Sequence, residues 1–134
     1  MIEEQFVSFD TARILKEAGF DVPCYVQYSE RGVQWNASCP ENFNANDWGC
    51  SCPTQALAAR WLREVHKIHV YAIQTNLPYT EPQTTKWEWG YVIDKVDDPN
   101  SDETTCDMYF DSYEAAFEAG LKRGLKLIKS KDYE

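Results

Sequence analysis

Apolar residues recur about every three to four positions in three segments of the chain, a spacing that is typical of amphipathic helices. The first segment runs from Asp10 to Ala18 and is followed by Gly19, the residue type that favours a left-handed C-terminal cap. The second segment begins near Pro53, which suits the first position of a helix because proline has no N–H to satisfy, and it ends near His66. The apolar stripe of this second helix consists of Leu57, Ala58, Trp61, Leu62 and Val65.

The third helical segment has the most complete start signal. Asp111 followed by Glu114 forms a capping box, in which each side chain bonds a backbone N–H of the other residue. Acidic residues gather at the start of this helix and basic residues toward its end, as the helix dipole favours. Ala116, Gly120 and Gly124 lie four residues apart and leave one strip of the helix without bulk, which predicts close packing on a sheet or another helix. For Gly124, a frayed and exposed helix end is the alternative.

Between these helices, apolar and polar residues alternate as they do in half-buried antiparallel strands. The segments Cys24–Tyr28 and Val33–Trp35 flank the turn residues Glu30–Gly32 and predict a hairpin. The segments Ile68–Ile73 and Trp87–Asp94 alternate over their whole length and predict two further strands. A short additional strand before the third helix would use Cys106, Met108 and Phe110.

The resulting order of elements is α-β-β-α-β-β-(β)-α. This order favours an α+β fold in which an antiparallel sheet of about four to five strands packs with three helices. It does not favour a doubly wound nucleotide-binding fold. With 134 residues and neither an internal repeat nor a low-complexity linker, we expect residues 1–134 to form a single domain.

The composition narrows the classes of partner. Hydrophobic residues make up 43% of the chain, which excludes a disordered protein. The net charge of −9 disfavours direct binding to nucleic acid or to anionic lipid, because both rely on Lys and Arg. The chain has no apolar run of about 18 residues that would span a membrane. Its first residues lack the features of a secretory signal, so we expect a cytoplasmic protein.

Cysteine chemistry offers two specific hypotheses. The chain contains Cys24, Cys39, Cys50, Cys52 and Cys106, an odd number that predicts reduced thiols in a cytosolic setting. Cys39, Cys50 and Cys52, with His66 or His69, are candidate ligands of a tetrahedral zinc ion. The isolated Cys-x-Cys pair favours ordinary thiols over metal, and the sequence indicates no cofactor. Alternatively, Cys52 precedes a helix start, where the dipole would lower its thiol pKa, and a histidine partner would make it a nucleophile.

Two long loops, Asn36–Cys52 and Asp97–Thr105, are the other candidate functional regions, because long loops in compact domains are often functional. The first contains an exposed-loop tryptophan, Trp48, beside Asp47, and tryptophans are common binding hot spots. The second begins with the acidic pair Asp97 and Asp98. We expect these four residues to contact a protein partner.

Three segments carry a resemblance to a group of proteins. They are Phe6–Phe20, Pro53–His66 and Phe110–Ala116, and they cover both ends and the middle of the chain. In these segments the chain resembles small proteins encoded in phages, prophages and mobile elements of gut bacteria, a group without an assigned function. The resemblance implies a phage-like accessory protein and brings no catalytic or binding residues with it.

The sequence therefore favours a non-enzymatic interaction module that binds another protein. The alternatives are a small thiol enzyme that uses Cys52 with His66 or His69, and a zinc-stabilised binding module.

Overall fold

The computed structural model describes residues 2–76, 87–98, 104–105 and 109–131. Its helices are α1 (Phe9–Glu17), α2 (Gln55–Val65) and α3 (Tyr113–Lys131), with a 3-10 turn, η1, over Phe43–Ala45. Its strands are β1 (Cys24–Ser29), β2 (Gln34–Glu41), β3 (Gly49–Ser51), β4 (Ile68–Asn76), β5 (Trp87–Lys95) and β6 (Thr104–Thr105).

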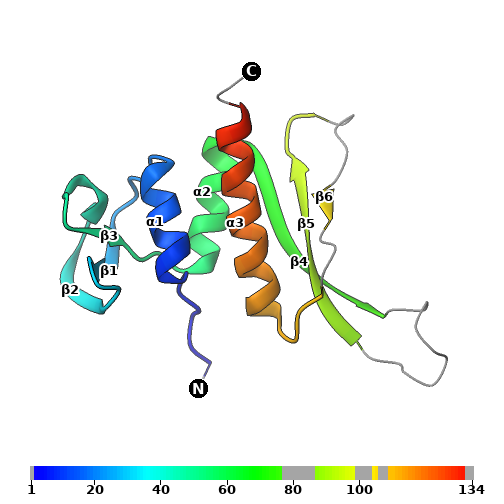
Figure 1. The fold of residues 1–134 in the computed structure, drawn as a ribbon, viewed down its shortest axis with the longest axis horizontal. Coiled ribbons are helices and arrows are strands. Elements are labelled where there is room, and N and C mark those ends of the chain that lie inside the picture. Colours follow the sequence, from blue (N-terminus) through cyan, green and yellow to red (C-terminus); the bar gives the residue numbers. More distant parts are fainter. Residues whose placement is uncertain (1, 77–86, 99–103, 106–108, 132–134) are drawn as a thin grey trace.

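The helices lie between two antiparallel sheets (Figure 1). The first sheet has the strand order β2-β1-β3 and packs on α1, and the second has the order β4-β5-β6 and packs on α2 and α3. The α+β class is confirmed, and the element order roughly matches the expected one, with β3 as an additional strand before α2. The expectation of one sheet was wrong: the chain passes through α2 between β3 and β4, and β4 then begins on the other side of the helical layer.

Local signals place α1 against the first sheet. Ser8 caps the helix by accepting a hydrogen bond from the backbone N–H of Thr11. At the other end, Gly19 adopts a φ of 94° and the N–H of Phe20 bonds the carbonyl of Leu15, as in a Schellman motif. Phe20 is thereby folded back into the core, where its ring meets Trp61 edge-on with centroids 5.3 Å apart.

The predicted hairpin is present, and it is followed by structure where the sequence predicted a long loop. Gly32 has a φ of 81° in the turn between β1 and β2, a conformation that glycine adopts at little cost. β2 continues to Glu41, well into the expected loop, and β3 pairs with the other side of β1. The loop expectation was wrong because a three-residue strand such as β3 has too few positions to show a periodic pattern.

The glycine strip of α3 packs on the second sheet as expected. A Cβ atom added at Gly120 would lie 2.8 Å from Val70 Cγ1 and 2.9 Å from Tyr91 Cβ. At Gly124, which is buried rather than frayed, the nearest atom would be Val70 Cγ2 at 3.1 Å. The helix begins two residues later than Asp111, and the side chain of Ser112, not that of Asp111, accepts a hydrogen bond from the N–H of Ala115.

The short strand expected before α3 is only partly within the described chain. Residues 106–108 lie outside it, whereas Phe110 forms an isolated antiparallel bridge with Trp89. Among the residues that the structure describes, no helix is both long enough and apolar enough to cross a membrane.

Candidate functional site

The outer face of the first sheet carries large apolar side chains that are open to solvent. Strand alternation puts Tyr25 of β1 on the side opposite to its buried neighbours, and its side chain is 60% exposed. Trp35 of β2 pairs with Gln27 of β1, so it shares this outer side and is 59% exposed. Val33, two residues before Trp35, is 54% exposed. We call Tyr25, Val33 and Trp35 the aromatic face.

The inner side of β1 is buried, and this contrast defines the aromatic face, whereas β2 is open to solvent on both sides. Cys24, Val26 and Tyr28 belong to the core cluster that also contains residues of α1 and α2. The residues of the aromatic face were not singled out from the sequence. Alternation in β1 could have revealed two sides, but only the position of α1 decides which side is covered.

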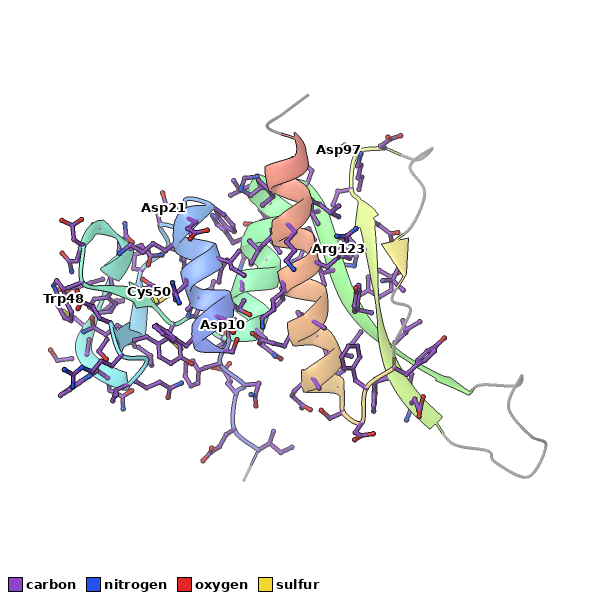
Figure 2. All side chains as sticks on the ribbon, in the orientation of Figure 1. Asp10, Asp21, Trp48, Cys50, Asp97 and Arg123 are labelled. Carbon is purple, nitrogen blue, oxygen red and sulfur yellow. The ribbon has the colours of Figure 1, made fainter. Side chains whose placement is uncertain are left out.

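The loop before β3 contributes the predicted binding residues Trp48 and Asp47. Trp48 is 51% exposed, and Figure 2 places it at the outer end of the molecule, remote from α2 and α3. Lys16 of α1 holds this loop by donating hydrogen bonds to the carbonyls of Asn46, at 2.5 Å, and Gly49, at 2.6 Å. Asp47 is exposed and lines a cavity of about 340 Å³ beside Lys16.

The other predicted acidic pair lies elsewhere. Asp97 and Asp98 follow β5 and are exposed, and Figure 2 shows Asp97 at the end of the molecule opposite to Trp48. The structure therefore does not bring the four predicted binding residues together. Trp48 and Asp47 belong with the first sheet, whereas the aspartates extend from the second.

A larger groove opens where the start of α3 meets the first sheet. It has a volume of about 730 Å³ and is lined by four carboxylates, those of Glu3, Glu4, Glu114 and Glu118. No Lys, Arg or His is among its described lining residues, which also include Tyr28 and Gln34 from the first sheet, and we call it the acidic groove. The sequence did not predict it, because its carboxylates are brought together from both ends of the chain.

Glu118 is the carboxylate of this groove with the most hydrogen bonds. Its Oε2 accepts from the backbone N–H of Ser8 at 3.0 Å, from the Ser8 hydroxyl at 2.8 Å and from the Thr11 hydroxyl. Its Oε1 accepts from Gln55 Nε2 at 3.0 Å. Burial raises the pKa of Glu118, but the bonds from Thr11, Gln55 and Ser8 outweigh it, so the pKa lies below the usual carboxyl value. The three helices are joined through this one side chain.

For Cys52, the candidate nucleophile, the pKa is shifted upward, in contrast to that of Glu118. Cys52 is 1% exposed, and burial raises its pKa to about 11 in spite of hydrogen bonding to Tyr28 and Gln34. Cys24 shows the same effect, with a pKa of about 11, and the pKa of Cys50 is also raised by burial. The expected lowering of the Cys52 thiol pKa by the start of α2 was therefore wrong, because burial of the thiolate raises this pKa instead.

Tyr28 lies in the same core cluster as Cys24, Cys50 and Cys52. Its hydroxyl donates to the carbonyl of Val7 at 2.7 Å and accepts from Gln34 Nε2 at 3.1 Å. Burial of the phenol raises its pKa to about 12. A neutral tyrosine and neutral thiols hold the N-terminal segment on the first sheet, which is a structural role.

The two histidines lie on the side of the second sheet. His66 caps the end of α2, and its ring packs edge-on against Trp61 with centroids 4.7 Å apart. His69 is on β4, where its ring lies 4.9 Å from that of Tyr71. Of the candidate zinc ligands, Cys39 is exposed on β2, whereas Cys50 and Cys52 are buried. Within the described part of the chain, no three His, Cys, Asp or Glu side chains are grouped so as to hold a metal ion.

Comparison of the chain with protein-family models, with curated proteins and with solved structures finds no match in any of the three. The resemblance to phage and mobile-element proteins stays a prediction.

Proposed function

We propose that the protein is a non-enzymatic interaction module that binds another protein through the aromatic face of its first sheet. The observation that carries the proposal is the exposure of Tyr25, Val33 and Trp35 on one side of the β1–β2 hairpin, opposite to the buried inner residues of β1. Exposed apolar groups that share one surface are typical of binding sites, and aromatic residues supply much of the energy at protein interfaces.

The charge of the chain indicates the kind of partner. With a net charge of −9, the protein attracts basic protein surfaces and repels nucleic acid. The aromatic rings suit such a partner as well, because Lys and Arg side chains bind the faces of Trp and Tyr rings. Trp48 and Asp47 belong to the loop before β3 of the same sheet, where Trp48 offers a further exposed ring and Asp47 lines the cavity beside Lys16.

The chemistry of the interior supports binding over catalysis. The thiolate form that a cysteine nucleophile needs is disfavoured at Cys52, whose pKa is raised to about 11. The carboxylate of Glu118 in the acidic groove has a lowered pKa and accepts hydrogen bonds from Ser8 and Gln55, so it is poorly suited to act as a proton donor at neutral pH.

Site-specific photo-crosslinking in the cells that encode the protein tests the proposal. A benzoylphenylalanine at Trp35 is expected to give a discrete covalent product with one protein, whereas the same probe at Val65, which is 57% exposed at the end of α2, gives none. The captured protein is then purified, and Trp35→Ser should weaken its binding at least tenfold while Val65→Ser leaves it unchanged. Equal crosslinking at both positions, or unchanged affinity of Trp35→Ser, would refute the proposal.

A further inference from the structure

The long edge of the first sheet is open. β2 pairs with β1 on one side, and no other described strand pairs with it on the other. Seven of its eight residues are exposed, and Figure 1 shows the strand at the outer margin of the molecule. The unpaired backbone N–H and C=O groups of an edge strand are a template for a further strand.

The hydrogen-bonding pattern identifies the groups that face outward. The N–H of Ser29 donates to the carbonyl of Val33 at 2.9 Å, so these two residues form a hydrogen-bonded pair at the turn. Such pairs alternate along an antiparallel ladder, so Trp35 directs its backbone groups toward Gln27. The backbone groups of Gln34 and Asn36 consequently point away from β1 and are available to a partner.

The opposite edge of the same sheet, on β3, is already hydrogen-bonded to other residues, so β2 provides the open edge of this sheet. The N–H of Ser51 in β3 donates to Asn44 Oδ1 at 2.8 Å, and the hydroxyl of Ser51 accepts from the N–H of Phe43 at 3.1 Å. Natural edges are protected by charges, proline, bulges or covering segments. β2 carries no charge over Gln34–Cys39, and its bulge opposite Tyr25 and its Pro40 protect only the later part of the strand, which leaves Gln34–Asn36 as the regular open edge.

The acidic groove begins where this edge begins. Gln34 is the first residue of β2 and also lines the groove, which contains four carboxylates and no basic residue among its described lining. A strand that pairs along β2 and continues past Gln34 therefore reaches a cavity that favours cationic side chains. A second copy of the chain fits poorly, because it would bring another acidic groove and a further net charge of −9 to the same place.

We propose that the partner docks as an extended segment that adds a strand to β2 and places Lys or Arg side chains in the acidic groove. This inference rests on the proposed function and specifies its mode: main-chain hydrogen bonds to Gln34 and Asn36 supply affinity, and the charges determine which segments bind. Apolar residues on the outer side of the added strand lie beside Trp35.

A synthetic peptide tests this mode without knowledge of the natural partner. The probe has five alternating Thr and Val residues followed by Lys-Arg-Lys, with both ends blocked. Two controls carry Glu in place of the basic residues, or N-methyl groups on alternate residues of the Thr/Val half. Titration into ¹⁵N-labelled protein is expected to shift the amide signals of β2 and to slow amide exchange at Gln34 and Asn36, and both controls should bind at least tenfold more weakly.

A pair of variants at one position gives the matched control in the protein. Asn36→Pro removes an N–H that faces solvent, so the pairing of β1 with β2 is retained and probe binding falls at least tenfold. Asn36→Thr keeps the N–H and should bind the probe as the wild type does. Equal binding of the N-methylated peptide, or signals that shift on the aromatic face without slowed exchange at Gln34 and Asn36, overturns strand addition while leaving the proposed function standing.

Two further outcomes also overturn the inference. Absence of binding of the probe at millimolar concentration would exclude a basic extended segment as the occupant. Concentration-dependent dimerisation that Asn36→Pro abolishes would assign the edge to a second copy of the chain. Failure of the proposed function is recognised separately, by the absence of site-specific crosslinks at Trp35.

Discussion

Substitution of Glu118 tests whether its hydrogen bonds stabilise the packing of the three helices. Its carboxylate accepts hydrogen bonds from the first residues of α1 and α2 and from the Ser8 cap, while its own backbone belongs to α3. Glu118→Gln keeps the size of the side chain but replaces one acceptor oxygen with an NH₂ group. Whichever way the amide turns, that NH₂ faces hydrogen-bond donors that need an acceptor.

The expected cost follows from the strength of hydrogen bonds to charged groups, which contribute about 1.5–3 kcal/mol each. The glutamine side chain keeps one oxygen, which still accepts the hydrogen bonds on its side of the group, and only the bonds to the other oxygen are lost. We therefore expect the free energy of unfolding to fall by about 2 kcal/mol at pH 7. For a domain of this size, that loss lowers Tm by roughly 6–10 °C. Glu114→Gln, one turn earlier on the same helix and exposed, should change the free energy of unfolding by less than about 0.5 kcal/mol.

The pH dependence carries a second, independent signature. Because the pKa of Glu118 is lowered in the folded state, its contribution to stability is complete above the ordinary carboxyl value of about 4.3 and is lost as pH falls through the lowered pKa. The difference in stability between wild type and Glu118→Gln should therefore be constant from pH 7 to about pH 5 and shrink in stronger acid.

Urea denaturation followed by circular dichroism, at a series of pH values, measures both quantities. The reasoning is refuted if Glu118→Gln is as stable as Glu114→Gln at pH 7. It is equally refuted if the loss at pH 7 persists unchanged in strong acid, because the ionised carboxylate would then not be the stabilising group.

Three further predictions concern packing, capping and thiols. By thermal denaturation, Gly120→Ala should destabilise the protein by about 1–2 kcal/mol, because overpacking against the second sheet exceeds a gain of about 1 kcal/mol in helix propensity. Gly124→Ala, with its nearest contact at 3.1 Å, should be neutral or slightly stabilising, and the reverse order would contradict the packing of α3. In urea titrations, Ser112→Ala should lower the free energy of unfolding by about 1 kcal/mol and Asp111→Ala by less than about 0.5 kcal/mol, because Ser112 caps α3. Equal losses for the two variants would contradict this assignment of the cap. In native protein, Cys39 should react readily with maleimide, whereas the buried Cys24, Cys50 and Cys52 should react only on unfolding, as peptide mass spectrometry can establish.

The elements that the sequence predicted well are those whose own residues determine them. The repeat of apolar positions located α1 and α2 to within about two residues, and Gly19 marked the end of α1 because its conformation is a local requirement. β4 and β5 were located in the same way, since each alternates over many positions.

The features that the sequence did not predict depend on contacts between distant segments. β3 is a strand because β1 offers it a free edge, and its three residues carry no pattern of their own. The division into two sheets depends on which side of the helical layer each hairpin occupies, which no local signal specifies. Similarly, nothing in the sequence distinguishes Glu118 from the other acidic residues near the start of α3. Its role as a hydrogen-bond acceptor depends on the fold, which brings Ser8 next to its carboxylate.

The same reasoning explains why the candidate site lies on the first sheet. A helical layer between two sheets can cover only the inner side of each, so the outer side of β1 is left uncovered by the helices. In β1 the inner residues Cys24, Val26 and Tyr28 pack into the core, whereas Tyr25 lies on the exposed side and does not belong to the core. Burial in the core therefore does not account for the large apolar side chains of Tyr25 and Trp35. The proposed contact with a protein partner would account for them, and strand addition at the open edge of β2 would orient that contact.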